Sequence, residues 1–411
     1  MLARRRVADL LKSPSADFDV LIKGWVRTRR DSKGGFSFLE INDGSCLANV
    51  QVVADKHLSN YEHEVLKLHP GSSLAVEGRL VRSQGKNQSL EIQASGIRVY
   101  GFCDPESYPI QKKEISFEKL RELAHLRPRT QTFGAVYRLR HVLAAAVHDF
   151  FRSRGFLWVH TPIITASDCE GAGAMFRVTT LDLPNAKFSR TPEGRVDFRE
   201  DFFGRESYLT VSGQLEGETG ACALGNIYTF GPTFRAENSN TPRHLAEFWM
   251  IEPEMAFAEL SDDMDLAEDF LKFLVNAALA HSPDDLAFLN EKVEPNLLSS
   301  LRQISEKSFV RITYTEAVKI LAESGAAFSF PVKWGGDLQT EHERFLTEVH
   351  FKGPGIVTHY TREIKSFSMK QNPDGKTVAA MDVLFPRIGE IIGGSQREDD
   401  LAKLETRMGE S

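Results

Sequence analysis

The chain has 411 residues, of which 41% are hydrophobic and 26% are charged. This composition is typical of a globular protein with two or three cores, and it excludes a disordered chain, a collagen-like repeat and a coiled-coil rod. No stretch approaches the roughly 18 consecutive apolar residues of a membrane span. The cysteines lie far apart without C-x-x-C spacing; they are Cys46, Cys103, Cys169 and Cys222. We therefore expect a cytoplasmic protein with reduced thiols and no zinc site.

Charge is unevenly distributed along the chain. The net charge is −7, yet the first 35 residues hold nine Lys or Arg and only four Asp, a local charge of +5. A basic segment on an acidic chain favours a polyanionic partner for one domain. A solvated surface explains the same pattern equally well.

The first hundred residues have the apolar–polar alternation of β-strands. The alternation predicts strands over 20–26, 36–41, 47–53, 73–80 and 89–93, and helical spacing predicts a helix over 59–68. Three strands, a helix and two strands are the plan of a five-stranded OB-fold barrel, which binds oligonucleotides on its second and third strands. We predict such an all-β barrel over residues 1–102. A small β domain used for protein contacts is the alternative.

A Pro- and charge-rich stretch over 103–135 is predicted to be a hinge. Apolar residues then recur at i, i+3 and i+4 from Val136 to Phe151, which predicts an amphipathic helix that ends at Gly155. Strands and helices mix beyond it without strict βαβ alternation. We therefore predict an α+β domain on a largely antiparallel sheet over 136–411.

Three stretches of this second domain carry residues suited to chemistry. Residues 155–164 combine a Gly-aromatic turn with a strand that contains Pro162, which suits an edge or an irregularity. The tetrapeptide 234–237, Phe-Arg-Ala-Glu, lies between a strand over 226–230 and a polar loop that leads to a second strand over 247–252. The third stretch runs from Met381 to Arg397 and combines two carboxylates with glycines and an Arg. Alone, each could be a surface salt bridge, a core residue or a turn.

Together these stretches resemble class II aminoacyl-tRNA synthetases, with motif 1 at 155–164 and motif 2 at 226–252. From the barrel to the last residue, the chain is similar to the bacterial-type asparaginyl-tRNA synthetases. The most specific pieces are residues 165–173, 209–215, 243–249 and 389–397. Residues from about 275 to 320 look like a small helical insertion of this family.

The resemblance implies ATP-dependent ligation of asparagine to tRNA(Asn) through asparaginyl-adenylate, by a homodimer joined through the motif 1 region. It implies an amino-acid site made of Glu170, Ser212, Gln214, Glu252, Ser395 and Arg397. It implies an ATP site made of Arg235, Glu237, His244, Phe248, Asp382 and Glu390. Among these, Arg235 and Glu390 would be catalytic, and Asp382 and Glu390 would hold Mg²⁺, which prefers oxygen ligands.

Two positions favour asparagine over aspartate. The related aspartyl enzymes place a Lys three residues after the Gln that matches Gln214, and Gly217 stands there in this chain. Glu252 would accept from the asparagine amide, and a buried site that pairs a specific donor discriminates strongly. An aspartyl-type or relaxed-specificity ligase remains the alternative.

The resemblance also implies that the barrel is the anticodon-binding domain. Arg29, Phe36, Phe38 and Gln51 would contact the anticodon, with one aromatic ring stacked on a base. We expect one of the two Phe to belong to the core, and Phe38 is the better match for stacking. Elsewhere, His342-Glu343 begins an H-E-x-x-H pattern that fails at Leu346, so His342 is expected to be structural or on the tRNA side.

The printed sequence contains no glycine-rich motif 3 after Arg397. In the family this motif carries an Arg that grips the γ-phosphate of ATP, so the activity of the 411-residue chain is left open. A non-catalytic tRNA- or amino-acid-binding paralogue is the third hypothesis.

Overall fold

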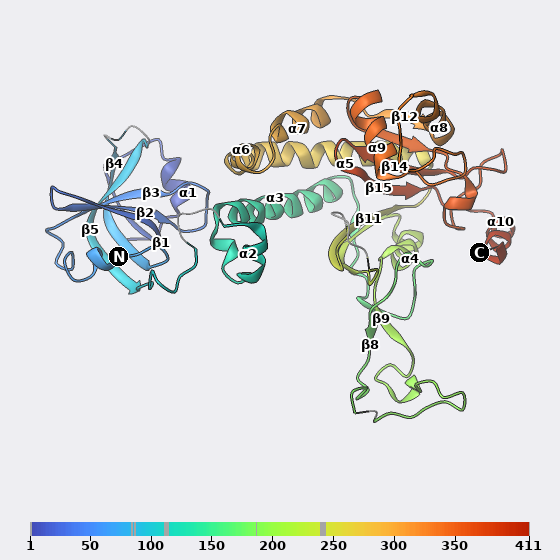
Figure 1. Ribbon diagram of the computed structural model, residues 1–411, viewed down its shortest axis with the longest axis horizontal. Helices are drawn as coiled ribbons and strands as arrows, with labels where there is room; N and C mark the ends of the chain where they lie inside the picture. The colour runs from blue at the N-terminus through green and yellow to red at the C-terminus, as the bar shows by residue number, and fades with distance from the viewer. Residues whose placement is uncertain are drawn as a thin grey trace. The chain divides into compact units, whose positions relative to one another are not determined.

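The computed structural model describes residues 2–83, 85, 88–110, 115–185, 187–238 and 244–410 of the chain (Figure 1). The chain forms two compact units. The first consists of Met1–Leu143 with Ala278–Leu298, and the second of Ala144–Ala277 with Ser299–Ser411. In the described part of the chain, no helix combines the length and apolarity needed to cross a membrane.

A closed five-stranded barrel in the first unit confirms the predicted OB-type topology. Its strands are β1 (Phe18–Ser32), β2 (Phe36–Asn42), β3 (Val50–Asp55), β4 (Ser73–Arg82) and β5 (Leu90–Gly101), in spatial order β1-β2-β3-β5-β4. Because side chains alternate along each strand, Leu39 and Ile41 of β2 are fully buried in the barrel core. Gly78 of β4 allows close packing, since a Cβ there would lie 2.2 Å from the carbonyl oxygen of Gln93.

The helix predicted over 59–68 is wrong. This segment consists of turns and a short 3₁₀ helix, η1 (Val65–Lys67). The expected apolar side chains, Tyr61, Val65 and Leu68, are buried in the barrel core. Nη1 of Arg29 donates to the carbonyl oxygens of Val65 (3.3 Å), Leu66 and Leu68 (3.1 Å). The Val65 oxygen also accepts from the Leu68 amide at 3.1 Å, so the Arg29 side chain caps the end of this short turn.

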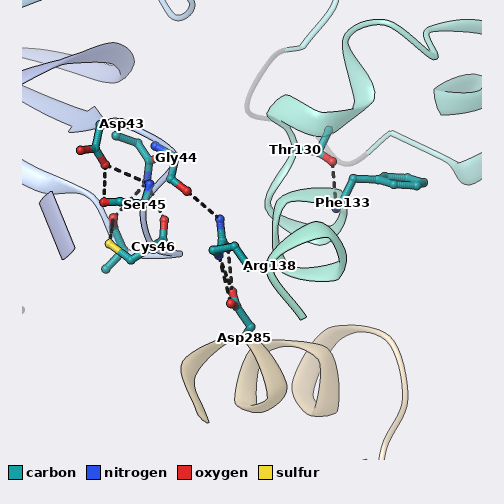
Figure 2. A network of polar contacts seen from close by, with 10 residues as sticks. Asp43, Gly44, Ser45, Cys46, Thr130, Phe133, Arg138 and Asp285 are labelled. Carbon is teal, nitrogen blue, oxygen red and sulfur yellow. Dashed lines mark hydrogen bonds and ion pairs between the residues drawn. The ribbon is translucent and has the colours of Figure 1, made fainter. Parts of the chain in front are cut away.

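Short helices complete the first unit. They are α1 (Val7–Leu11), α2 (Phe117–Glu122), η2 (Arg127–Arg129), the first part of α3 (Gln131–Ser153), α6 (Pro283–Lys292) and the start of α7 (Leu297–Glu306). Figure 2 shows a polar clasp between three segments of this unit. Arg138 of α3 pairs with the buried Asp285 of α6 at 2.7 Å and donates to the Gly44 carbonyl at 3.4 Å.

The second unit contains three sheets. The first has the order β11-β10-β6, from β6 (Leu157–Trp158), β10 (Asn226–Phe234) and β11 (Glu247–Met255). The second has the order β12-β13-β14-β15, from β12 (Val310–Thr313), β13 (Gly355–Thr358), β14 (Ala380–Phe385) and β15 (Gly389–Ser395). A small third sheet joins β7 (Ile164–Thr165), β9 (Ser207–Leu209) and β8 (Arg177–Val178). The pairing is antiparallel as predicted, except that β6–β10 and β12–β13 are parallel.

Helices pack on these sheets and fix the positions of the strands. The remaining elements are η3 (Phe198–Glu200), α4 (Gln214–Leu224), α5 (Leu260–His281), α8 (Tyr314–Glu323), α9 (Thr340–Arg344), the π-helix η4 (Phe345–His350), η5 (Arg362–Ile364) and α10 (Leu401–Glu410). Phe150 and Phe151 of α3 pack with Tyr228 of β10 and Phe270 of α5 in one apolar cluster. Helix α3 ends two residues before Gly155, whose φ of +79° is left-handed.

The single strand predicted for 156–164 is divided. Its ends form β6 and β7, which belong to different sheets, and Pro162 lies between them. Proline lacks the N–H that a continuous ladder would need.

Candidate active site

The β10–β11 hairpin places the predicted motif 2 residues. Arg235 directly follows β10, and its Nε and Nη2 each donate to the Val211 carbonyl at 3.3 Å. Its guanidinium lies 5.5 Å from the centroid of the Phe248 ring on β11. A planar cation and an aromatic face are therefore adjacent at one end of the hairpin. Residues 239–243 of the intervening loop, including Arg243, lie outside the described residues.

Glu237 lies against a loop that carries glycines. Its Oε1 accepts from the backbone amide of Ala174 at 2.9 Å. Hydrogen bonds from its own amide and that of Ala174 hold the pKa of the Glu237 carboxyl below its ordinary value, and nearby His244 adds to this effect. A Cβ on Gly173 would lie 2.7 Å from Glu237 Oε1, so only glycine permits this approach without a shift.

Glu252 organises the start of helix α4. Its carboxylate accepts from the Ser212 hydroxyl, from the Gly213 amide (3.1 Å) and from the Thr229 hydroxyl (2.7 Å). Ser212 and Thr229 are buried. The predicted amide acceptor thus already accepts from three protein donors, about three of the roughly four lone-pair sites of a carboxylate.

Arg397 meets carboxylates that the sequence analysis did not assign. Its Nε lies 3.0 Å from Glu218 Oε1, and its Nη2 lies 3.7 Å from Glu254 Oε1. Its Nη1 donates to the Ser395 hydroxyl at 2.9 Å. Gln214 Nε2 donates to the same Glu218 oxygen at 3.0 Å. Predicted amino-acid-site residues are therefore brought together around a Glu one helical turn after Gln214.

Two carboxyl groups near Arg397 have raised pKa values because they are buried. Burial raises the pKa of Glu254 to about 8 and that of Asp263 to about 6, while the Arg397 charge opposes both shifts. Glu254 is thus largely protonated at neutral pH. Gly217 is buried beside it, and a Cβ at position 217 would lie 3.4 Å from Glu254 Cγ.

The predicted Glu170 lies in a loop with unusual backbone geometry. Cys169 and Glu170 have φ values of +47° and +61°. Glu170 Oε2 accepts from the buried Ser368 hydroxyl at 3.0 Å, a contact between segments 198 residues apart. The left-handed backbone is thus accompanied by a long-range hydrogen bond that fixes the carboxylate.

The two predicted metal ligands lie on neighbouring strands. Asp382 on β14 is paired in register with Gly393 on β15. A Cβ on Gly393 would lie 3.0 Å from Glu390 Oε1 and 3.7 Å from Asp382 Oδ1, so glycine leaves a gap between the carboxylates. Two oxygen-bearing side chains beside a gap suit Mg²⁺, which completes its shell with water and phosphate oxygens. Within the described ranges, no three His, Cys, Asp or Glu residues group as a metal site.

Lys365 also contacts this site. Its Nζ lies 2.9 Å from both carboxylate oxygens of Asp382, and 4.2 Å from the centroid of the Tyr360 ring. Asp382 is buried, as is Tyr360. No spacing pattern in the sequence links Lys365 to Asp382, so this contact could not be predicted from the sequence.

On the barrel, the predicted anticodon residues divide into two groups. Phe36 and Phe38 are both half-buried on the outer face of β2, with ring centroids 5.2 Å apart. The expectation that one of them is a core residue is therefore wrong. Gln51 is on the adjacent strand and donates to Glu91 at 3.1 Å.

The predicted Arg29 does not lie on the face of the two phenylalanines, and its neighbour Arg30 does. Arg29 is opposite Leu39 in the β1–β2 register and its guanidinium binds backbone carbonyls below the barrel surface. Arg30 is opposite Phe38 and is exposed. Strand alternation places Arg30 on the face of the two phenylalanines, and this signal is already present in the sequence.

His342 is structural. It is 1% exposed, its Nδ1 accepts from the Gln339 amide at 3.0 Å, and its Nε2 lies 3.2 Å from the Phe330 carbonyl oxygen.

Comparisons with known proteins agree with this arrangement. The family model described as tRNA synthetases class II (D, K and N) matches residues 117–411, and that of the OB-fold nucleic acid binding domain matches residues 20–100. The asparagine–tRNA ligase of Porphyromonas gingivalis is 57% identical over 100% of this chain and 87% of its own length. The Xylella fastidiosa asparagine–tRNA ligase is 60% identical over 95% of this chain and 84% of its own length.

A solved structure extends the likeness. The asparaginyl-tRNA synthetase from Pyrococcus horikoshii, complexed with asparaginyl-adenylate, is 30% identical, with a TM-score of 0.84 over 100% of this chain and 87% of that one. These identities favour the asparaginyl over the aspartyl alternative and over a non-catalytic paralogue. The chain therefore belongs to the asparaginyl-tRNA synthetases of class II, the ligases that join asparagine to tRNA.

Proposed function

We propose that this chain activates asparagine with ATP and transfers it to tRNA(Asn), using the residues gathered around Arg235, Arg397 and Asp382. The observation that carries the proposal is Arg397, which is held by Ser395 at 2.9 Å and by Glu218 at 3.0 Å. A guanidinium donates and cannot accept, whereas a carboxylate accepts. The pair therefore complements the carbonyl oxygen and the NH₂ group of an asparagine side chain.

In this proposal Glu218 accepts from the amide NH₂, in place of Glu252. Three protein donors already engage Glu252, so its role is to hold Ser212 and the start of α4. An aspartate carboxylate would lie against Glu218 with no hydrogen to donate. Gly217 offers no cation to offset that repulsion.

The first chemical step is a displacement at phosphorus. An oxygen of the asparagine carboxylate bonds to the α-phosphorus of ATP, and the bond to the bridging oxygen breaks to release pyrophosphate. Arg235 would neutralise the charge that develops on the α-phosphate, while Phe248 stacks on adenine and Glu237 accepts from its amino group. His244, close to Glu237, would lie near the nucleotide as well.

Further groups would position the substrates. Glu170, Ser212 and Gln214 would hold the asparagine ammonium group. Asp382 and Glu390 would hold Mg²⁺, which supplies charge neutralisation at the triphosphate. In the second step, the terminal ribose hydroxyl of tRNA attacks the carbonyl carbon of the adenylate and AMP leaves.

The barrel would bind the anticodon through Phe36, Phe38, Gln51 and, in addition, Arg30. Half-exposed aromatic rings beside a cation suit unstacked bases. A homodimer through the motif 1 region is supported by Leu157 and Trp158 of β6, which are 50% and 53% exposed. The four cysteines are free, which supports a cytoplasmic location.

Asparagine-dependent ATP–pyrophosphate exchange tests this function. We expect exchange with asparagine to exceed that with aspartate by at least about a hundredfold, since the site pairs a specific donor. Equal rates with the two amino acids would contradict the assignment of Arg397 and Glu218 to the asparagine side chain.

A further inference from the structure

The strongest feature outside the assigned roles is a partly buried cation at the proposed metal site. Lys365 follows η5, and its Nζ is 2.9 Å from both Asp382 oxygens. The side chains of Lys365 and Asp382 are only 20% and 11% exposed. The ammonium also lies over the ring of Tyr360, 4.2 Å from its centroid.

The surroundings show why a cation is needed there. Asp382, Glu390 and Glu343 converge on this region, and the Glu390 amide donates to Glu343 at 3.3 Å. Asp382 and Glu343 are both buried. A buried carboxylate without a counter-charge is strongly unfavourable, because it loses the hydration it has in water. Lys365 supplies that charge from within the chain.

A lysine in this position conflicts with a metal ion. Both Asp382 oxygens face the same ammonium, and a divalent ion on either oxygen would place like charges within a few ångströms of each other. The two cations therefore compete for one carboxylate. Nucleotide changes the balance, because triphosphate oxygens offer the metal additional ligands and so favour a metal ion over the ammonium at Asp382.

We propose that Lys365 is a stand-in cation that keeps Asp382 from binding a divalent ion until a nucleotide triphosphate arrives, and then yields the carboxylate to the metal. Lys365 is a positioning residue in this account. The inference rests on the proposed function, because it takes Asp382 as a ligand of the ATP-bound metal. The proposed exchange of cations occurs between the free and the nucleotide-bound states of the chain. It can therefore be tested without asparagine or tRNA.

Binding of Mn²⁺ alone, followed by electron paramagnetic resonance of the free ion, tests the proposal on the full chain. K365M should bind Mn²⁺ at least tenfold more tightly than the unmodified chain in the absence of nucleotide, and Mn²⁺ should raise its melting temperature. K365R retains the cation and should behave as the unmodified chain. K365M/D382N should lose the tightened binding, because the vacated carboxylate is gone.

Lys370 provides a matched control. It forms a similar pair with Asp399, 2.9 Å from Oδ1, and this pair is more exposed and does not contact Asp382. K370M should leave Mn²⁺ affinity unchanged. Unchanged affinity in K365M, or an equal rise in K370M, would overturn the proposal.

If K365M does not fold, the proposal can still be tested by a measurement on the unmodified chain. Amine labelling read by mass spectrometry should find Lys365 protected with Mg²⁺ alone and more reactive with Mg²⁺ plus α,β-methylene-ATP. A labelling rate that nucleotide does not change would overturn the proposal. If this release occurs but asparagine-dependent exchange fails, the fault lies with the proposed amino-acid specificity and not with Lys365.

Discussion

The site around Arg397 and the outer face of the barrel differ in how their side chains are held. Around Arg397, polar side chains lie close to one another: Nη1 donates to the Ser395 hydroxyl at 2.9 Å, and Nε lies 3.0 Å from Glu218 Oε1. On the barrel, Phe36 and Phe38 are half-exposed and touch mainly each other. The site around Arg397 is thus preorganised for one small ligand. The barrel instead offers half-exposed rings on which bases can stack once they have left their own stack. Substitutions should therefore be costly at the site around Arg397 and mild on the barrel.

The largest effect is expected for Arg397→Met. It removes the donor for the asparagine carbonyl and leaves Glu218 without its counter-charge, so the exchange rate should fall by about 10²–10³. Pyrophosphate exchange at saturating ATP measures this. Arg195→Met, at an exposed arginine of the same unit, should leave the rate unchanged. An Arg397→Met variant that keeps more than a tenth of the rate would show that the site does not depend on this guanidinium.

Glu218→Gln should have the next largest effect. Losing a charged hydrogen bond should weaken transition-state binding of asparagine by about 2–3 kcal/mol. The value of kcat/KM for asparagine should fall accordingly, and its ratio to the value for aspartate should become smaller. Glu216→Gln on the same helix is the control. If Glu252→Gln narrows the preference and Glu218→Gln does not, the amide acceptor is Glu252 as the sequence analysis predicted.

Phe38→Ala should cost roughly 1–3 kcal/mol of tRNA affinity through the lost stacking. Adenylate formation should not change, because the barrel takes no part in that step. Filter binding of tRNA(Asn) beside thermal unfolding separates the two roles. Tyr100→Ala removes another exposed ring of the barrel and should have little effect on affinity. Unfolding of the Phe38→Ala barrel would instead make Phe38 a structural residue.

A pH dependence of stability is also expected, and it arises from Glu254 beside Arg397. The folded pKa of Glu254 is raised from 4.5 to about 8, so the folded state binds more protons than the unfolded state between these values. Its contribution to stability is full below about pH 4.5 and is lost as pH rises through 8. The melting temperature should therefore decline over this window, and Glu254→Gln should flatten the decline. An identical slope in the variant would contradict the burial of this carboxyl.

The sequence predicted elements that follow from local pattern. Alternation placed the five barrel strands, and the hairpin with Arg235 and Phe248 formed where its two strands were expected. The helix over 59–68 failed because this segment forms turns with irregular backbone hydrogen bonds, such as that from the Leu66 amide to the Tyr61 carbonyl, and Arg29, distant in sequence, binds the carbonyls at its end. Local spacing contains no information about such a partner.

The same limit explains the site residues that were missed. Glu218 follows Gln214 by one helical turn, so its position on that face was available from the sequence. Its contact with Arg397, in the segment that follows β15, depends on tertiary structure and was not available. Lys365 and Asp382 are joined only by tertiary structure. Arg30 was predictable in principle, since alternation alone separates it from Arg29.

The clasp of Arg138 and Asp285 bears on how the chain is synthesised. Its two halves are 147 residues apart, and both belong to the unit that contains the barrel. The barrel strands end at Gly101 and can close as soon as that segment has left the ribosome. Arg138 can bind the Gly44 carbonyl once its own segment has emerged, but it can pair with Asp285 only after α6 has been translated. The first unit therefore completes its packing only after most of the motif 2 segment of the second unit has left the ribosome.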